Sequence, residues 1–208
     1  PACIRRMAKN DYSLALVMRS LKLFMVLLGC KPESRYTEQH DIFFGIGYEL
    51  GYLLPDMYAF WPEANRKIHI DSWREVTQVN GYAVKVISRT DLSGDMQREA
   101  KLFFINLGGY KENDLEEYHY KMLIACTDKG IAVQQAKQTA FYRHTGFTGA
   151  VSHIDDKYGV DVDEIYEISD ILPARVKEKY AIVLSPAMKN KEDEMHVGYL
   201  KVEKLVKD

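Results

Sequence analysis

The dominant hydrophobic pattern begins with an apolar run at Leu21–Leu28 that ends at Gly29. A run of this kind, bounded by glycine, is typical of a central β-strand that is buried on both faces. After a polar loop at Cys30–Thr37, apolar residues recur at helical spacing from Ile42 until Pro55, which ends or kinks a helix. The pattern therefore predicts a strand, a loop and a helix, in this order.

The next residues alternate between apolar and polar, which is the pattern of a half-buried strand. This alternation covers Arg66–Asp71. Farther on, Val76–Val79 and Tyr82–Ile87 flank the pair Asn80-Gly81. An Asn-Gly pair between β-forming segments marks a two-residue hairpin turn, because both turn positions need a positive φ. The first part of the chain is thus predicted to contain a strand, a helix, a second strand and a hairpin.

This unit is repeated in the second half of the chain. The segment Lys22–His40 aligns without a gap to Lys101–His119, and eight of the nineteen aligned positions are identical. In the second copy, Asp114 with Glu117 three residues later resembles a capping box and predicts a helix that continues to about His144. His153-Ile154-Asp155 repeats the earlier motif His69-Ile70-Asp71. An internal repeat of this kind constrains the architecture more strongly than any single element does.

We therefore predict an α/β fold in which two tandem β-α-β-β repeats form a pseudo-symmetric sheet with helices packed on it. The predicted parts, in chain order, are an N-terminal extension at 1–20, a first repeat unit at 21–88, a linker at 89–99, a second repeat unit at 100–172 and a C-terminal extension at 173–208. The C-terminal extension is expected to add a short helix and two further strands. The two strands are expected at Ala181–Leu184 and Val197–Val206.

Composition and charge limit the kinds of molecule that this protein is expected to bind. The chain has 47% apolar and 28% charged residues, which is ordinary for a globular protein. A net charge of −2 and a pI near 6.4 argue against nucleic acid as a partner, because phosphate binding needs a basic face. No apolar run approaches the roughly 20 residues that span a bilayer. Three widely spaced cysteines predict a reducing cytoplasm and no disulfide framework. A homodimer is left open.

Histidine and carboxylate residues are the candidate chemical groups, because the two copies share them. The repeated set is Glu38, His40, His69 and Asp71 in the first copy, with Glu117, His119, His153 and Asp155 in the second. These groups could bridge backbone atoms structurally, contact a polar ligand or bind a metal ion. The structural role is favoured, since no closely spaced ligand pair such as H-E-x-x-H or C-x-x-C is present.

The loop after each first strand is a second candidate. Ligands of open α/β sheets bind beyond the carboxyl ends of the strands, and helix N-termini favour anions. Lys31 and Arg35 lie in the first of these loops and would suit an anion, although neither loop matches a phosphate-binding fingerprint. Cys30 is a poor candidate for a shared nucleophile, because the second copy has Gly109 at that place.

Several motifs of the first unit resemble a known bacterial family. They are LKLFMVLLGC, TEQHDIFFGIG, FWPEA, KIHIDSWREV and the Asn-Gly-Tyr hairpin. Together they are similar to the family called domain of unknown function 1543, and LGG, EEYH and HID carry a looser similarity in the second unit. The resemblance implies one or two copies of the unit per chain. It implies no activity, cofactor or catalytic residue.

The favoured prediction is a non-catalytic cytoplasmic module that binds a small polar or anionic ligand or a protein partner. The alternative is a hydrolase-type enzyme that uses the repeated His and Asp residues with help from a metal ion. No cofactor and no specific metal ligand are predicted. The predicted ligand-binding residues are Lys31, Arg35, His40, His69, Asp71, His119, His153 and Asp155.

Overall fold

A computed structural model describes residues 20–93, 100–110, 115–145, 161–188 and 191–205. The chain divides into two compact units. Unit 1 contains the described residues up to Trp73 together with those from Val197 onward, and unit 2 contains the described residues between Arg74 and His196. Each unit is described separately below.

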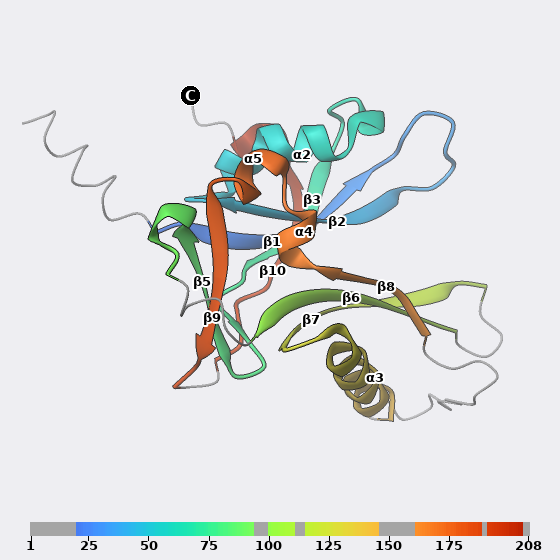
Figure 1. The fold of residues 1–208 in the computed structure, drawn as a ribbon. Coiled ribbons are helices and arrows are strands. Elements are labelled where there is room, and N and C mark those ends of the chain that lie inside the picture. Colours follow the sequence, from blue (N-terminus) through green and yellow to red (C-terminus); the bar gives the residue numbers. More distant parts are fainter. Residues whose placement is uncertain (1–19, 94–99, 111–114, 146–160, 189–190, 206–208) are drawn as a thin grey trace, which may run out of the picture. The chain divides into compact units, whose positions relative to one another are not determined.

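Unit 1 is built on a four-stranded sheet with the order β10-β3-β1-β2 (Figure 1). The bounds of these strands are Lys22–Cys30 for β1, Gln39–Gly47 for β2, His69–Glu75 for β3 and His196–Lys201 for β10. Strands β1 and β2 form an antiparallel hairpin that pairs Lys22 with Gly47 at one end and Cys30 with Gln39 at the other. Alternate residues of β1 point into one core and are almost fully buried. This burial confirms the predicted first strand.

The helix predicted from Ile42 is wrong over its first half, because this segment is strand β2. Phe43, Phe44 and Ile46 are all buried, so the segment is apolar on both faces and lacks the alternation of a surface strand. Their spacing fits a helix equally well, and pairing with β1 decides between the two. Helical structure begins only at Leu50, in the sequence η1, α2 and η2. Their bounds are Leu50–Leu53, Leu54–Phe60 and Pro62–Ala64.

These helical turns supply apolar side chains to the core of unit 1. The short C-terminal helix η4, Val202–Leu205, adds Val202 to it. The buried members of the core are Phe24, Val26, Leu28, Cys30, Phe43, Leu50, Leu53, Met57, Ala64, Ile68, Ile70 and Val202. One face of the sheet is therefore filled by packing, and the residues between these core positions along each strand face the other way.

Unit 2 contains a three-stranded sheet with the order β7-β6-β8 and a long helix, α3, on one face (Figure 1). The bounds are Lys101–Tyr110 for β6, Glu117–Cys126 for β7, Lys129–Thr145 for α3 and Asp161–Glu167 for β8. Ala132 and Ala136 of α3 are fully buried, and they pack in the same core as residues of β6 and β7. Both neighbours of β6 run antiparallel to it.

The second predicted helix therefore starts in the wrong place. Glu117, expected to close a capping box, begins strand β7 instead. The residue that caps α3 is Asp128, whose carboxylate accepts a hydrogen bond from the backbone N–H of Ile131 at 3.0 Å. A capping-box pattern is short, so it also occurs by chance where tertiary pairing favours a strand.

A second sheet of unit 2 has the order β4-β5-β9. Its bounds are Gln78–Val79 for β4, Tyr82–Ser88 for β5 and Tyr180–Pro186 for β9. The predicted hairpin is confirmed: Val79 pairs with Tyr82, and Asn80 and Gly81 both have positive φ, 34° and 89°. Short helices connect the remaining parts: η3 at Arg89–Asp91, α4 at Ile168–Ile171 and α5 at Ala174–Lys177. The helix and first strand predicted near the C-terminus are confirmed by α5 and β9.

The fold is mixed α/β with mostly antiparallel sheets, but the predicted order of elements is wrong. A β-α-β-β order was expected in each repeat, whereas each repeat begins with two paired strands, β1–β2 or β6–β7, followed by helical structure and then a third strand, β3 or β8. The third strand lies beside the first in both cases, so β1 and β6 are the central strands of β3-β1-β2 and β8-β6-β7. No helix in the described part of the chain is long and apolar enough to cross a membrane.

Candidate functional site

Four polar side chains meet on the sheet of unit 1 at the carboxyl end of β1. Register places His40 of β2 directly opposite Gly29 of β1. Glu38 is two residues before His40, so both side chains lie on the same face of the hairpin. His69 and Asp71 are likewise two residues apart on β3, the strand on the other side of β1. Side chains from two strands therefore converge over the strand between them.

The distances show a closed ring of contacts. His69 Nε2 lies 3.1 Å from Glu38 Oε1 and 3.3 Å from Asp71 Oδ1. His40 Nε2 lies 3.1 Å from Asp71 Oδ2 and 3.7 Å from Glu38 Oε2. Each imidazole thus faces both carboxylates, and each carboxylate divides its oxygens between the two imidazoles. We refer to Glu38, His40, His69 and Asp71 as the His/carboxylate cluster.

The cluster has a buried side and an open side. His69 is only 6% exposed, and its ring lies against that of Tyr199 with a centroid distance of 4.4 Å. The side chains of His40 and Glu38 are 42% and 46% exposed. Within the described residues, His69 Nε2 and Asp71 Oδ2 are buried without a hydrogen-bond partner. Buried polar atoms without partners are uncommon and need an explanation.

The floor of the cluster is a glycine. A Cβ placed on Gly29 would collide with His69 Nε2 and would lie 2.8 Å from Asp71 Oδ2. The imidazole and the carboxylate therefore occupy the space that a side chain would need, and only glycine allows this close approach. Glycine at this position, read from the sequence as the turn that ends the strand, is in fact a paired strand residue.

The spacing of these side chains is compatible with a metal centre. Zinc bound by histidine and carboxylate has bonds of about 2.0–2.2 Å, so the ligand atoms of a tetrahedral ion lie roughly 3.3–3.6 Å apart. The four nitrogen-to-oxygen distances in the cluster, 3.1 to 3.7 Å, span this range. One ligand atom from each of Glu38, His40 and His69 lies within 4.8 Å of the others. Asp71 lies within 3.3 Å of both imidazole nitrogens, although it is not one of these three ligand residues.

Unit 2 contains a related group of side chains, the second cluster, formed by Glu117, His119 and Asp163. His119 lies opposite Gly108 in the β6–β7 pairing. Its Nε2 lies 3.3 Å from Asp163 Oδ2 and 4.0 Å from Glu117 Oε2. A Cβ on Gly108 would meet Glu117 Oε1 at 2.5 Å and Asp163 Oδ2 at 2.6 Å. The second cluster has one imidazole, and all three of its side chains are partly exposed.

The structure brings together only part of the predicted ligand set. His40, His69 and Asp71 converge with Glu38, and His119 converges with Glu117. The predicted His153 and Asp155 lie outside the described residues. Asp163, which the sequence comparison missed, is the residue of β8 that joins the second cluster. Its sequence signal is Asp161-Val162-Asp163, which has the same polar–apolar–polar alternation as His69-Ile70-Asp71.

Lys31 and Arg35 lie in the turn between β1 and β2, where both are exposed. The expectation of an anion site in this turn depended on a helix that begins after it. Strand β2 occupies that position, so no helix N-terminus is available there to attract an anion. The remaining basis for anion binding in this turn is the charge of two exposed side chains.

Cys30 is adjacent to the cluster along β1 and is 1% exposed. Burial raises the pKa of this thiol, and the negative charges of Glu38 and Glu63 raise it further. A raised pKa keeps the thiol protonated near neutral pH, and the protonated form is a poor nucleophile. The chemistry of this region therefore lies with the imidazoles and carboxylates.

Comparison with known proteins shows the fold and a family resemblance. No curated protein matches this chain. A crystal structure described as a protein Il1583 from Idiomarina loihiensis is similar in fold, with a TM-score of 0.56 and 19% identity, over 88% of this chain and 98% of that one. Residues 35–86 match a family described as Domain of Unknown Function (DUF1543). This match is a single stretch and does not establish a second copy. The resemblance of the first repeat to the DUF1543 family, inferred from its motifs, is thus confirmed from the β1–β2 turn into β5.

Proposed function

We propose that the chain is a metal-ion-binding module whose His/carboxylate cluster holds one divalent transition-metal ion of zinc type. The observation that carries the proposal is that the Nε2 atom of His69 is buried between two carboxylates without a hydrogen bond to any described residue. This atom lies within 3.3 Å of oxygens from both carboxylates. A cation at the centre of the cluster would accept the lone pair of this nitrogen and neutralise both carboxylates.

The donor set supports a borderline-soft cation over a hard one. Two imidazoles favour zinc, copper, nickel or iron, whereas magnesium and calcium prefer sites made only of oxygen. Tyr199 supports this role, because its ring packs against His69 and helps to hold the imidazole plane. Ligand orientation by such outer contacts is a general property of metal sites.

The segments from β1 to β3 and from β6 to β8 are proposed to be copies of one ancestral element. The support is the shared order of two strands, helical structure and a third strand, together with the matching registers Gly29–His40 and Gly108–His119. On this proposal, the second cluster is the counterpart of the first, with Asp163 in the place of Asp71. The module is proposed to be cytoplasmic, which its buried free thiols at Cys30 and Cys126 favour.

The experiment is a zinc titration of the chelator-treated full chain by calorimetry. Glu38→Gln removes a donor charge with little change in size, and Glu33→Gln makes the same change at an exposed residue of the same β1–β2 connection. Loss of outer contacts alone weakens metal sites about 10- to 100-fold, so Glu38→Gln should weaken the tightest zinc site by roughly 100-fold or more. Glu33→Gln should match the wild type. Equal zinc affinity in all three proteins would refute the proposal.

Solvent access favours a second candidate, a metal-assisted hydrolase-type enzyme. Because Glu38 and His40 are open to solvent, an ion held by three protein donors could keep a water ligand on that side. Zinc lowers the pKa of bound water to about 7 and so makes hydroxide available for hydrolysis. Zinc-dependent cleavage of simple nitrophenyl esters that is lost in Glu38→Gln and kept in Glu33→Gln would support this candidate. Zinc binding without turnover would leave the non-catalytic module.

A further inference from the structure

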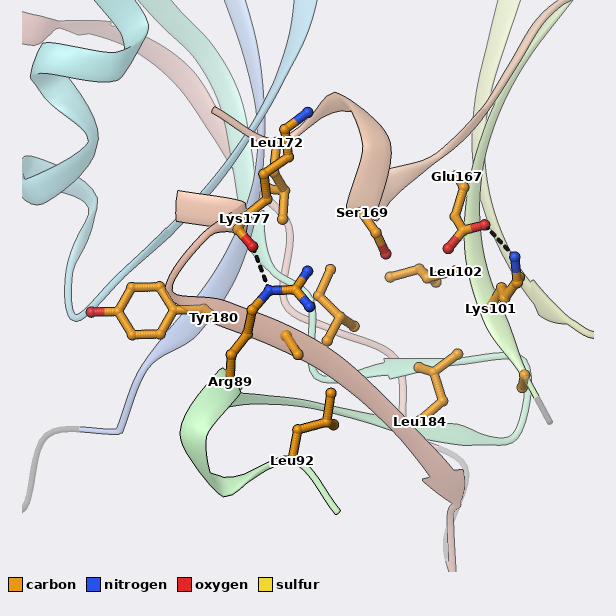
Figure 2. Close-up of a pocket in the computed structure, with 13 residues that line it drawn as sticks. Arg89, Leu92, Lys101, Leu102, Glu167, Ser169, Leu172, Lys177, Tyr180 and Leu184 are labelled. Atoms are coloured by element: carbon orange, nitrogen blue, oxygen red, sulfur yellow. Dashed lines mark hydrogen bonds and ion pairs between the residues drawn. The ribbon is translucent and has the colours of Figure 1, made fainter. Parts of the chain in front are cut away.

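Unit 2 contains a pocket that shares no residue with either cluster. Its volume is about 290 Å³, at the lower limit of the range for small-molecule sites. At about 30 Å³ per water molecule, it has room for roughly ten waters or a small organic ligand. The lining comes from η3, β6, the end of β8, β9 and the α4–α5 segment (Figure 2).

Much of the pocket lining is apolar. Strand β9, the start of β6 and the segments near η3 and α4 contribute aliphatic side chains that face the hollow. They are Leu92, Leu102, Leu172, Ile182 and Leu184. These side chains favour a ligand with a hydrocarbon body, because burial stabilises apolar surface by about 25 cal/mol per Å².

The lining also includes an arginine in a fixed position. Arg89 Nε donates a hydrogen bond to the backbone oxygen of Lys177 at 2.5 Å, and the backbone N–H of Arg89 donates to Lys179 O at 2.8 Å. These two bonds hold Arg89 at its backbone and at Nε. Figure 2 shows the terminal nitrogens of Arg89 directed into the pocket, and the hydroxyl of Ser169 directed toward the same space.

The other charged groups of the lining are already engaged. Lys101 Nζ lies 2.7 Å from Glu167 Oε2, and this partner raises the pKa of the lysine. Lys177 Nζ donates to Asp170 O at 2.9 Å. Among the lining residues, Arg89 is therefore the cation whose terminal donors remain available. A guanidinium with its Nε engaged still offers a pair of N–H groups that matches a carboxylate.

We propose that this pocket binds a small monocarboxylate with an apolar body, whose carboxylate pairs with Arg89 and accepts from Ser169. The hydrocarbon part would lie against the leucines and Ile182. A phosphate dianion fits less well, because a single available guanidinium faces it and Glu167 adds a like charge to the same lining. The inference is independent of the metal proposal, since no residue is common to the two sites.

The probes are benzoate, its neutral isostere benzamide, and inorganic phosphate. Each would be titrated into isotope-labelled, metal-free full-length protein, with binding followed by the backbone NMR signals of Arg89, Ser169 and Ile182. We expect saturable shifts with benzoate. Because hydrogen bonds to charged groups are the stronger class, benzamide should bind roughly tenfold or more weakly. Equal binding of benzoate and benzamide, stronger binding of phosphate, or no shift with benzoate would overturn the proposal.

Variants locate the site. Arg89→Met should reduce benzoate affinity to the benzamide level, whereas Lys85→Met, the same loss of charge at an exposed residue of β5, should bind like the wild type. If Arg89→Met fails to fold, Ser169→Phe provides the test, since it fills the hollow and leaves Arg89 in place. Loss of benzoate shifts in Ser169→Phe supports the site. Retained benzoate affinity in either folded variant overturns it.

Discussion

The imidazole of His69 occupies the space above Gly29 that a side chain at position 29 would need. A Cβ there would collide with Nε2 of His69 and lie 2.8 Å from a carboxylate oxygen of Asp71. The side chains of His69 and Asp71 thus pack directly against the backbone of β1 at Gly29. The same relationship holds in unit 2, where the side chains of Glu117 and Asp163 lie over Gly108.

This contact predicts the effect of Gly29→Ala. The added methyl group must displace His69, which is buried and held against Tyr199, so we expect a loss of roughly 1–3 kcal/mol in the free energy of unfolding. Zinc affinity measured by calorimetry should fall with it, because the imidazole leaves its position. Gly108→Ala is the matched control and should leave the tighter zinc site intact. Unchanged zinc affinity in Gly29→Ala would show that His69 is not a ligand.

A second prediction separates a metal site from a purely structural ion-pair network. In metal-free protein, Asp71→Asn removes one of two carboxylates that crowd the same imidazoles, so stability should hold or rise, as it often does when a strained site is disabled. If Asp71 serves only to bind the histidines, its loss should cost about 1.5–3 kcal/mol. Urea unfolding in the presence of chelator distinguishes the two. Asp41→Asn, on the same hairpin, is the control.

Zinc should reverse the order of stability expected for the wild type and Asp71→Asn in metal-free protein. A ligand that binds only the folded state at 100 times its Kd adds about 2.7 kcal/mol. The wild type and Asp41→Asn should therefore gain stability in zinc, and Asp71→Asn should gain much less. An equal gain in all three would place the metal elsewhere.

Local signals in the sequence were sufficient for some elements and insufficient for others. The Asn80-Gly81 turn was predicted correctly, because two residues of positive φ determine a hairpin without outside help. The segment from Ile42 was not, because its apolar residues fit a helix and a doubly buried strand alike. Only pairing with β1 resolves this ambiguity, because Gly45 and Gly47 weaken a helix and a strand by similar amounts.

The candidate site was only partly predictable, for a related reason. The repeat identified His40, His69 and Asp71, but spacing along the chain gave no sign that they touch. Their convergence depends on the register of β1 with β2 and on the position of β3 beside β1. Asp163 was missed because the repeat was aligned through the HID motif at residues 153–155, whereas the strand beside β6 is Asp161–Glu167.

The raised pKa of the Cys30 thiol predicts a loss of stability at alkaline pH. Burial, Glu38 and Glu63 raise the pKa of its thiol above the ordinary value of 9.0 in the folded protein. As pH rises past that value, the unfolded state releases the proton while the folded state keeps it. Unfolding is then favoured, so the stabilising contribution is complete below pH 9 and is lost as pH rises toward the folded pKa. Cys30→Ala lacks this contribution at every pH.

The measurement is urea unfolding of the wild type and Cys30→Ala at several pH values between 7 and 11. The difference in stability between the two proteins should shrink as pH rises, although other groups titrate in both. A difference that stays constant would mean that the thiol pKa is the same in the folded and unfolded states.

Asn80 should contribute more to the free energy of unfolding than its preference for the turn conformation explains. Its side-chain amide donates to Ala125 O at 2.9 Å and accepts from Ala125 N at 2.7 Å, which ties the hairpin to β7 within unit 2. Asn80→Gly keeps the positive φ and removes both bonds, so we expect a loss of about 1–3 kcal/mol in chemical unfolding. Asn65→Gly changes another asparagine of positive φ, 48°, and should stay within about 0.5 kcal/mol of the wild type. Equal effects would assign the loss to turn propensity alone.

The two clusters should differ in metal preference. Glu38, His40, His69 and Asp71 offer two imidazoles, whereas Glu117, His119 and Asp163 offer one imidazole among carboxylates. Fewer nitrogen donors weaken the preference for zinc over manganese, and the exposure of all three side chains makes the second cluster the looser site. A zinc titration of the full chain should therefore show a tight event followed by a weaker one. Manganese should compete mainly in the weaker event.

Variants of each cluster can assign the two zinc-binding events to their sites. His119→Gln should remove the weaker event and leave the tight one, because it alters only the second cluster. Glu38→Gln should remove the tight event and leave the weaker one, because it alters only the His/carboxylate cluster. If either variant abolishes both events, the clusters do not bind independently, and if neither variant changes the titration, the zinc binds outside both. Separate loss of each event would show that the chain carries two metal sites of unequal strength, each built over a glycine of a central strand.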